Sequence, residues 1–217
     1  MRLRTNEEAL SIINACAVEY KKNLSSNNLL FVTTGSNRAL CFETLFMPHN
    51  FKHLTGVKSN LSGLDFFDLA VRNRISPSEI TLADDGTTDL KLDILPQLMN
   101  IHVTARMIGD YDHSRPLLIA DKFAGAVTMA MGFVQTNGLY MPNTALKKDV
   151  RDITIHATRR RVTLIFVKHR HDIKYTFLSY IAKGLTIDEN AFANIIHEKV
   201  DMKKLNSIFP IPRKPIN

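Results

Sequence analysis

Four side chains that could move a proton or hold a phosphate stand where the chain is expected to turn or where a strand ends. His53 comes shortly before Gly56, which can turn the chain, and Lys122 and Lys168 each end a strand candidate. Tyr175 begins the strand expected after Lys168. Histidine suits acid or base work because its unperturbed pKa is about 6.5, and lysine suits phosphate as a point charge. We therefore take His53 as the leading catalytic candidate, with Lys122, Lys168 and Tyr175 as further candidates.

Each of these side chains also has a structural interpretation. His53 could be bonded to backbone, with Thr55 capping the end of its helix instead of orienting a phosphate or the histidine. Lys122 could be a surface lysine paired with its neighbour Asp121. Tyr175 could stack on a base or donate a hydrogen bond, or it could simply pack in a half-buried strand. The residue types alone leave both interpretations open.

Three basic clusters lie close together in the second half of the chain. Runs of charge are usually solvated faces, but three of them on one sheet would form a shared surface for RNA. Binding to such a surface would weaken steeply with salt. The clusters predicted to bind RNA or phosphate are Lys147, Lys148 and Arg151; Arg159, Arg160 and Arg161; and His169, Arg170, His171 and Lys174.

Composition indicates a basic globular protein. The 217 residues are 45% hydrophobic and carry a formal charge of +7, which favours a polyanion or an acidic surface as partner. Cys16 and Cys41 form no zinc or disulfide pattern, which fits a reducing cytosol. We expect no signal peptide, no membrane span, no cofactor and no metal. His169 and His171 could share a face of a strand, but no third ligand is evident.

The pattern of elements predicts the α+β class. We expect a capped helix over 6–24, a hairpin over 29–46, a turn or short helix ending at Gly56, and a helix over 90–107 that Pro96 kinks or restarts. Strand candidates follow from residue 117, with a basic-tipped hairpin over 161–182. This order suggests a small twisted antiparallel sheet with flanking N- and C-terminal helices. We expect one domain over 1–217, with an N-terminal helix in 1–27, a core in 28–184, and a helix and tail in 185–217.

Several ordered stretches resemble a known family. They are Asn-Phe-Lys-His-Leu-Thr-Gly-Val at 50–57, Ile-Gly-Asp-Tyr at 108–111, Leu-Ile-Ala-Asp-Lys at 118–122, the segment 140–152, Ile-Phe-Val-Lys at 165–168, Tyr175, and Ala-Lys-Gly at 182–184. Together they are similar to the phage-encoded domains grouped with barnase, EndoU, colicin-type tRNases and RelE. The resemblance covers about residues 28–184, and the His-Leu-Thr-Gly element is its most recognisable piece.

The resemblance implies helices packed on a sheet and metal-independent cleavage of RNA. It leaves three hypotheses: a ribonuclease, a non-catalytic inhibitor of a host defence complex, and an RNA-binding module without turnover. Its partner would accordingly be RNA or a nucleic-acid-binding host protein complex. The RNA target, any cognate antitoxin and the oligomeric state do not follow from the sequence.

Overall fold

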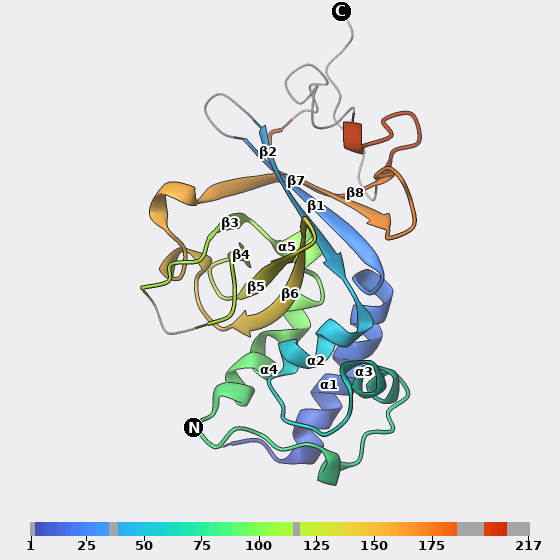
Figure 1. Ribbon diagram of the computed structural model, residues 1–217, viewed down its shortest axis with the longest axis vertical. Helices are drawn as coiled ribbons and strands as arrows, with labels where there is room; N and C mark the ends of the chain where they lie inside the picture. The colour runs from blue at the N-terminus through green and yellow to red at the C-terminus, as the bar shows by residue number, and fades with distance from the viewer. Residues whose placement is uncertain (1–2, 35–38, 115–117, 186–197, 208–217) are drawn as a thin grey trace, which may run out of the picture.

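The computed structural model describes residues 3–34, 39–114, 118–185 and 198–207 (Figure 1). Within these ranges, none of the helices combines the length and apolar character needed to cross a membrane. The helix expected after residue 185 falls mostly on residues outside the described ranges, and so does the turn expected between the strands of the first hairpin.

The N-terminal helix forms where the sequence predicts it. Thr5 accepts from the Glu8 amide at 3.3 Å and the Glu8 carboxylate accepts from the Thr5 amide at 2.9 Å, which is the predicted capping box. Pro96 lies inside a helix that ends at Leu98, and a further short helix begins at Ile101. The α-helices are α1 (Asn6–Asn23), α2 (Phe51–Thr55), α3 (Gly63–Val71), α4 (Thr87–Leu98) and α5 (Ile101–Thr104); the 3-10 helices are η1 (Pro48–Asn50), η2 (Pro77–Glu79), η3 (Val150–Asp152) and η4 (His156–Thr158).

The α+β class is confirmed, but the predicted small twisted antiparallel sheet is wrong. The strands follow the order β1-β2-β6-β5-β4-β3-β7, and β7 also pairs with β1, so the sheet closes into a seven-stranded barrel. β8 and β9 continue from β7, and the pairings β2–β6 and β8–β9 are parallel. The strands are β1 (Asn27–Thr34), β2 (Ala39–Phe46), β3 (Met107–Asp110), β4 (Lys122–Gly125), β5 (Ala130–Thr136), β6 (Leu139–Leu146), β7 (Arg160–His169), β8 (Phe177–Ile181) and β9 (Asn206–Ser207).

The length of β7 explains the closure. One edge of this strand pairs with β1 from Val162 to His169. It also pairs with β3 at Arg160 and Arg161, and with β8 from Leu164 to Val167. A strand that has partners along both edges, and that is apolar enough to be buried on both faces, closes the ring.

The inner face of the barrel and the helices share one core. Phe42 of β2 lies 5.5 Å from Phe31 of β1 and 5.2 Å from Phe133 of β5, measured between ring centroids. Tyr20 of α1 lies 5.2 Å from the ring of Phe51 at the start of α2. Figure 1 shows α1–α4 gathered at one end of the sheet. Phenylalanine is the main aromatic residue of this core.

A second hydrophobic cluster covers the outer face of β1 and β7. Leu30 and Phe166 are fully buried there, and Val200 of the segment 198–207 packs on them. Polar bonds fasten this segment: the Tyr175 hydroxyl donates to Glu43 Oε1 at 2.7 Å, and Lys199 Nζ donates to Glu43 Oε2 at 2.6 Å. Glu43 therefore holds two distant parts of the chain on the outer face of the barrel.

Glu43 should make the stability of the protein depend on pH. Burial raises the pKa of this carboxyl, but the hydrogen bonds from Lys199 and Tyr175 outweigh that effect and hold the pKa below its ordinary value of 4.5. A depressed pKa in the folded state adds stability above the ordinary value, and this stability is lost as the pH falls through the folded-state pKa. We expect the free energy of unfolding, measured with urea, to fall less steeply below about pH 4.5 in Glu43→Gln than in the unmodified protein.

The matched control is Glu198→Gln, which removes an exposed carboxylate beside Lys199. This variant should keep the slope of the unmodified protein. Equal slopes in all three proteins would contradict the link between Glu43 and stability.

Candidate functional site

His53 lies on a short helix whose opposite side belongs to the core. Phe51 and Leu54 of α2 are fully buried, whereas the His53 side chain is exposed. The helix ends at Gly56, which has a φ of +75°, a left-handed conformation that glycine adopts without a steric penalty. Of the two expectations for this segment, a turn or a short helix ending at Gly56, the structure shows the short helix, and it presents the histidine to solvent.

The surroundings of His53 are cationic. Partial desolvation lowers the pKa of His53, and the charges of Lys52, His49 and Lys91 lower it further. Lys52 is held in place because its Nζ donates to the backbone carbonyls of Ser59 and Leu61 at 2.7 and 2.6 Å. A histidine with a depressed pKa is mainly neutral at pH 7 and can accept a proton.

Thr55 takes the structural role that the sequence left open. Its side chain is fully buried, and its hydroxyl donates to the carbonyl of Lys52 at 2.7 Å. The same hydroxyl accepts from the amide of Val57 at 3.3 Å. The threonine thus fixes the end of α2, and it offers no surface from which to contact a phosphate in this conformation.

Lys122 is paired with a carboxylate, but the partner is not its sequence neighbour Asp121. Its Nζ forms an ion pair with Asp110, its cross-strand partner on β3. It also lies 5.7 Å from the centre of the Tyr140 ring. Asp121 instead accepts from the amide of Gln135 at 2.7 Å. A phosphate at Lys122 would have to compete with Asp110.

Lys168 and Tyr175 lie together on the outer face. Lys168 Nζ is 5.0 Å from the centre of the Tyr175 ring, and it donates to the carbonyl of Ile173 at 3.3 Å. Tyr175 is 1% exposed, and β8 begins two residues after it. Burial and the neighbouring Glu43 raise the pKa of the Tyr175 hydroxyl. In this conformation Tyr175 is too buried to stack on a base, and its hydroxyl already has a partner.

The four catalytic candidates do not share one groove. Side chains alternate between the two faces of a strand. Lys122 is two residues from Ala124 of the inner core, whereas Lys168 is two residues from Phe166 of the outer cluster. The charges that shift the pKa of His53 come from α2, η1 and α4. The structure therefore brings Lys168 and Tyr175 together and leaves His53 and Lys122 apart from them.

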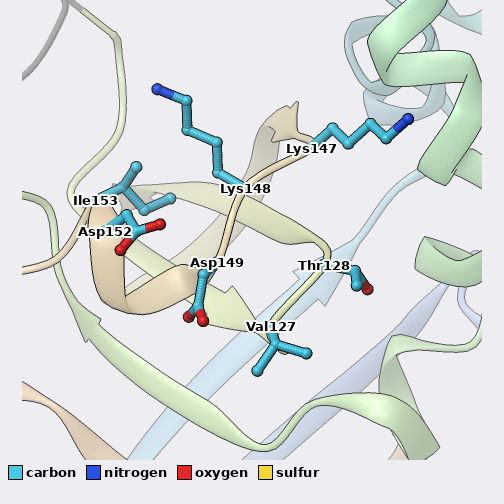
Figure 2. A pocket seen from close by; sticks show the side chains of 7 residues that line it. All are labelled: Val127, Thr128, Lys147, Lys148, Asp149, Asp152 and Ile153. Atoms are coloured by element: carbon cyan, nitrogen blue, oxygen red, sulfur yellow. The ribbon is translucent and has the colours of Figure 1, made fainter.

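The three side chains of the first basic cluster have different surroundings at the end of β6. Lys147 Nζ forms an ion pair with Asp93 of α4 at 2.7 Å, while Arg151 forms a fork with Asp149, with Nε 2.9 Å from Oδ2. Lys148 lines an open pocket with Val127, and Figure 2 shows Lys147 and Lys148 leaving the strand end in different directions. Of the three predicted phosphate ligands here, two already contact carboxylates.

Two of the three arginines in the second cluster donate hydrogen bonds to backbone carbonyls. Arg159 donates to the carbonyl of Thr154, with Nη2 2.7 Å from the oxygen. Arg160 Nη1 donates to the carbonyls of Ala157 and Arg159 at 2.8 and 2.7 Å. Arg161 is exposed on β7. Arg159 and Arg160 hold the segment that leads into β7, so Arg161 is the member of this cluster most accessible to a ligand.

The third cluster forms the tip of the hairpin between β7 and β8, as predicted. The side chains of His169, Arg170, His171 and Lys174 are exposed, and so is Ile173 at 91%. The rings of His169 and His171 lie 5.3 Å apart, and Arg170 Nε donates to His171 Nε2 at 3.0 Å. Over the described residues, no group of three His, Cys, Asp or Glu side chains gathers in a way that could hold a metal ion.

Sequence reasoning missed Lys91, which is a partly buried lysine of α4 near His53. Its neighbours in sequence read as an ordinary amphipathic helix, and no motif marks it. Only the packing of α2 against α4 places this lysine beside the histidine.

The comparisons with known proteins agree with the resemblance seen in the sequence. Residues 12–184 match the sequence model of the family described as phage-Barnase-EndoU-ColicinE5/D-RelE like nuclease4. A search of curated proteins gave no match, and neither did a search of solved structures. The family match covers most of the chain, including the His53 helix and every strand of the barrel. The chain therefore belongs to the phage-Barnase-EndoU-ColicinE5/D-RelE like nuclease4 family.

Proposed function

We propose that this protein is a metal-independent endoribonuclease that cleaves RNA through acid–base attack by the 2′-hydroxyl. The observation that carries the proposal is the exposed His53, which lies among cations and has a depressed pKa in a chain of a nuclease-like family. Perturbed titrating groups of this kind are frequent at functional sites.

In the proposed reaction, neutral His53 takes the proton of the 2′-hydroxyl. The 2′-oxygen then bonds to phosphorus, the bond from phosphorus to the 5′-oxygen breaks, and the leaving oxygen takes up a proton from water. The products are a 2′,3′-cyclic phosphate and a 5′-hydroxyl. Positive charge around His53 would stabilise the phosphorane on the way, because its negative charge exceeds that of the phosphodiester.

The other expectations remain part of this proposal. We place the reaction in a cytosol, where Cys16 and Cys41 would remain the free thiols that the structure shows. The exposed cations, above all Arg161, Lys148 and the tip of the β7–β8 hairpin, would attract RNA to the surface.

His53 should be required for RNA cleavage in the presence of EDTA. General acid–base groups contribute about 10²–10⁴-fold, so His53→Ala should lower kcat/KM by at least about 100-fold. Gel electrophoresis of end-labelled RNA measures the cleavage and identifies the cyclic phosphate. His156→Ala removes another exposed histidine and serves as the matched control. Cleavage that survives in His53→Ala would show that the site is elsewhere.

The pH profile should report the depressed pKa of His53. A general base acts in its neutral form, so kcat/KM should rise with pH as His53 loses its proton. Because the pKa of His53 is lowered, the midpoint of that rise should lie below the ordinary value of 6.5. Steady-state rates measured between about pH 4.5 and 8 give the midpoint. A midpoint at or above 6.5 would contradict the assignment of His53 as the base.

The contacts of two other catalytic candidates, Lys122 and Tyr175, favour a second function. Lys122 and Tyr175 both contact carboxylates, while the exposed β7–β8 tip is strongly basic. This pattern supports a non-catalytic inhibitor that covers the nucleic-acid channel of a host defence complex. A stable stoichiometric complex with such a host assembly in a pull-down, without RNA products, would support this function over the ribonuclease.

A further inference from the structure

The aliphatic part of the Lys91 side chain packs against Gly56, at the end of the helix that carries His53. A Cβ atom built on Gly56 would lie 2.6 Å from Cδ of Lys91 and 3.5 Å from its Cε, so no other residue fits there unless Lys91 moves. The φ of +75° also favours glycine at this position. The glycine of the His-Leu-Thr-Gly element therefore has two roles: it ends α2, and it leaves room for Lys91.

A hydrogen bond from a buried threonine joins the two helices in this arrangement. The Thr88 hydroxyl of α4 donates to the carbonyl of Gly56 at 3.0 Å and accepts from the amide of Ala83 at 3.0 Å, and Thr88 is fully buried. Residues three apart in a helix lie on the same side. The bond at Thr88 therefore sets Lys91 against the end of α2.

The ammonium of Lys91 has no partner among the residues that the structure describes. Of the residues that the structure describes, none forms an ion pair or a hydrogen bond with Lys91 Nζ, whereas Lys122, Lys147 and Lys199 each contact a carboxylate. Lys91 is partly buried, and that burial lowers the pKa of its ammonium. Burying a cation without a partner costs free energy, and an anion that bound there would recover it.

Lys91 and His53 interact with each other through space. The charge of Lys91 is one of those that lower the pKa of His53; Lys52 and His49 supply the others. Lys52 already donates to two backbone carbonyls, so its ammonium is less available to a ligand than that of Lys91. The end of α2 therefore presents a proton acceptor and an uncommitted cation that are close enough for the charge of Lys91 to act on His53.

We propose that Lys91 binds the phosphate group on which His53 acts, with its ammonium holding a non-bridging oxygen of an RNA phosphodiester beside the imidazole. This inference rests on the ribonuclease activity proposed above and adds a ligand that no motif indicates. Lys91 contributes charge and position, while the proton transfer belongs to His53.

The test measures phosphate binding without turnover. The His53 imidazole is followed by NMR while inorganic phosphate, and separately a short 2′-O-methyl RNA of mixed sequence, is added. The methylated RNA cannot supply the attacking hydroxyl, so only binding is observed. Lys91→Met keeps an unbranched stem against Gly56 and removes the charge; Lys91→Arg keeps the charge; Lys58→Met removes an exposed lysine nearby and is the control.

We expect both probes to shift the His53 resonance in the unmodified protein and in Lys58→Met. Loss of a charged hydrogen-bond donor should weaken both affinities about tenfold or more in Lys91→Met, and Lys91→Arg should restore most of the loss. If Lys91→Met does not fold, Lys91→Gln takes its place. Affinities in the neutral variant equal to those of the unmodified protein would overturn the proposal.

The two proposals can fail separately. Phosphate binding that depends on Lys91, in a protein that never cleaves RNA, supports this site and contradicts the ribonuclease. RNA cleavage that depends on His53 but proceeds at full kcat/KM in Lys91→Met supports the ribonuclease and contradicts the role of Lys91.

Discussion

The antiparallel pairing of β1 with β7 is the contact on which the rest of the structure depends. It joins Asn27–Thr33 to residues more than 120 positions later in the chain, and it turns an open sheet into a ring with an inner and an outer face. Both faces of the middle of β1 are fully buried: Leu29 and Phe31 belong to the inner core, and Leu30 and Val32 to the outer cluster. Because the ring has two faces, strand residues that look alike in sequence can end on opposite sides of it.

That separation decides how the basic and catalytic candidates should be interpreted. Lys122 lies on the inner side with Asp110, whereas Lys168 lies on the outer side near Tyr175 and Glu43. A lysine with a carboxylate partner stabilises the sheet, and a ligand must displace that partner before it can bind. Lys91 belongs to neither face of the barrel, because it is carried on α4 at the end of α2. In this comparison, the lysine without a partner among the described residues is therefore carried on a helix, not on a face of the sheet.

Local patterns predicted the parts of the fold that local physics controls. The capping box at Thr5, the helix end at Gly56 and the β7–β8 hairpin each depend on residues near one another in sequence, and each formed as expected. β6 is hard to recognise from sequence because Pro142 and Asn143 interrupt its apolar pattern. Pro142 is tolerated because the register between β5 and β6 shifts at this point, which forms a bulge where the amide that proline lacks is not needed. The barrel closure could not be predicted, because it depends on pairing between strands that no local signal connects.

The candidate site shows the same division. His53 could be found from sequence because a histidine before a glycine turn is visible in a single motif. Its chemistry could not, because the pKa depends on partial burial and on surrounding charges that include Lys91, which joins the site only through the packing of α2 against α4. The environment of Tyr175 likewise depends on distant residues, because its hydroxyl donates to Glu43, which lies 132 residues away in sequence. In this protein a motif locates a reactive side chain, while long-range packing determines which charges surround it and whether it is free to react.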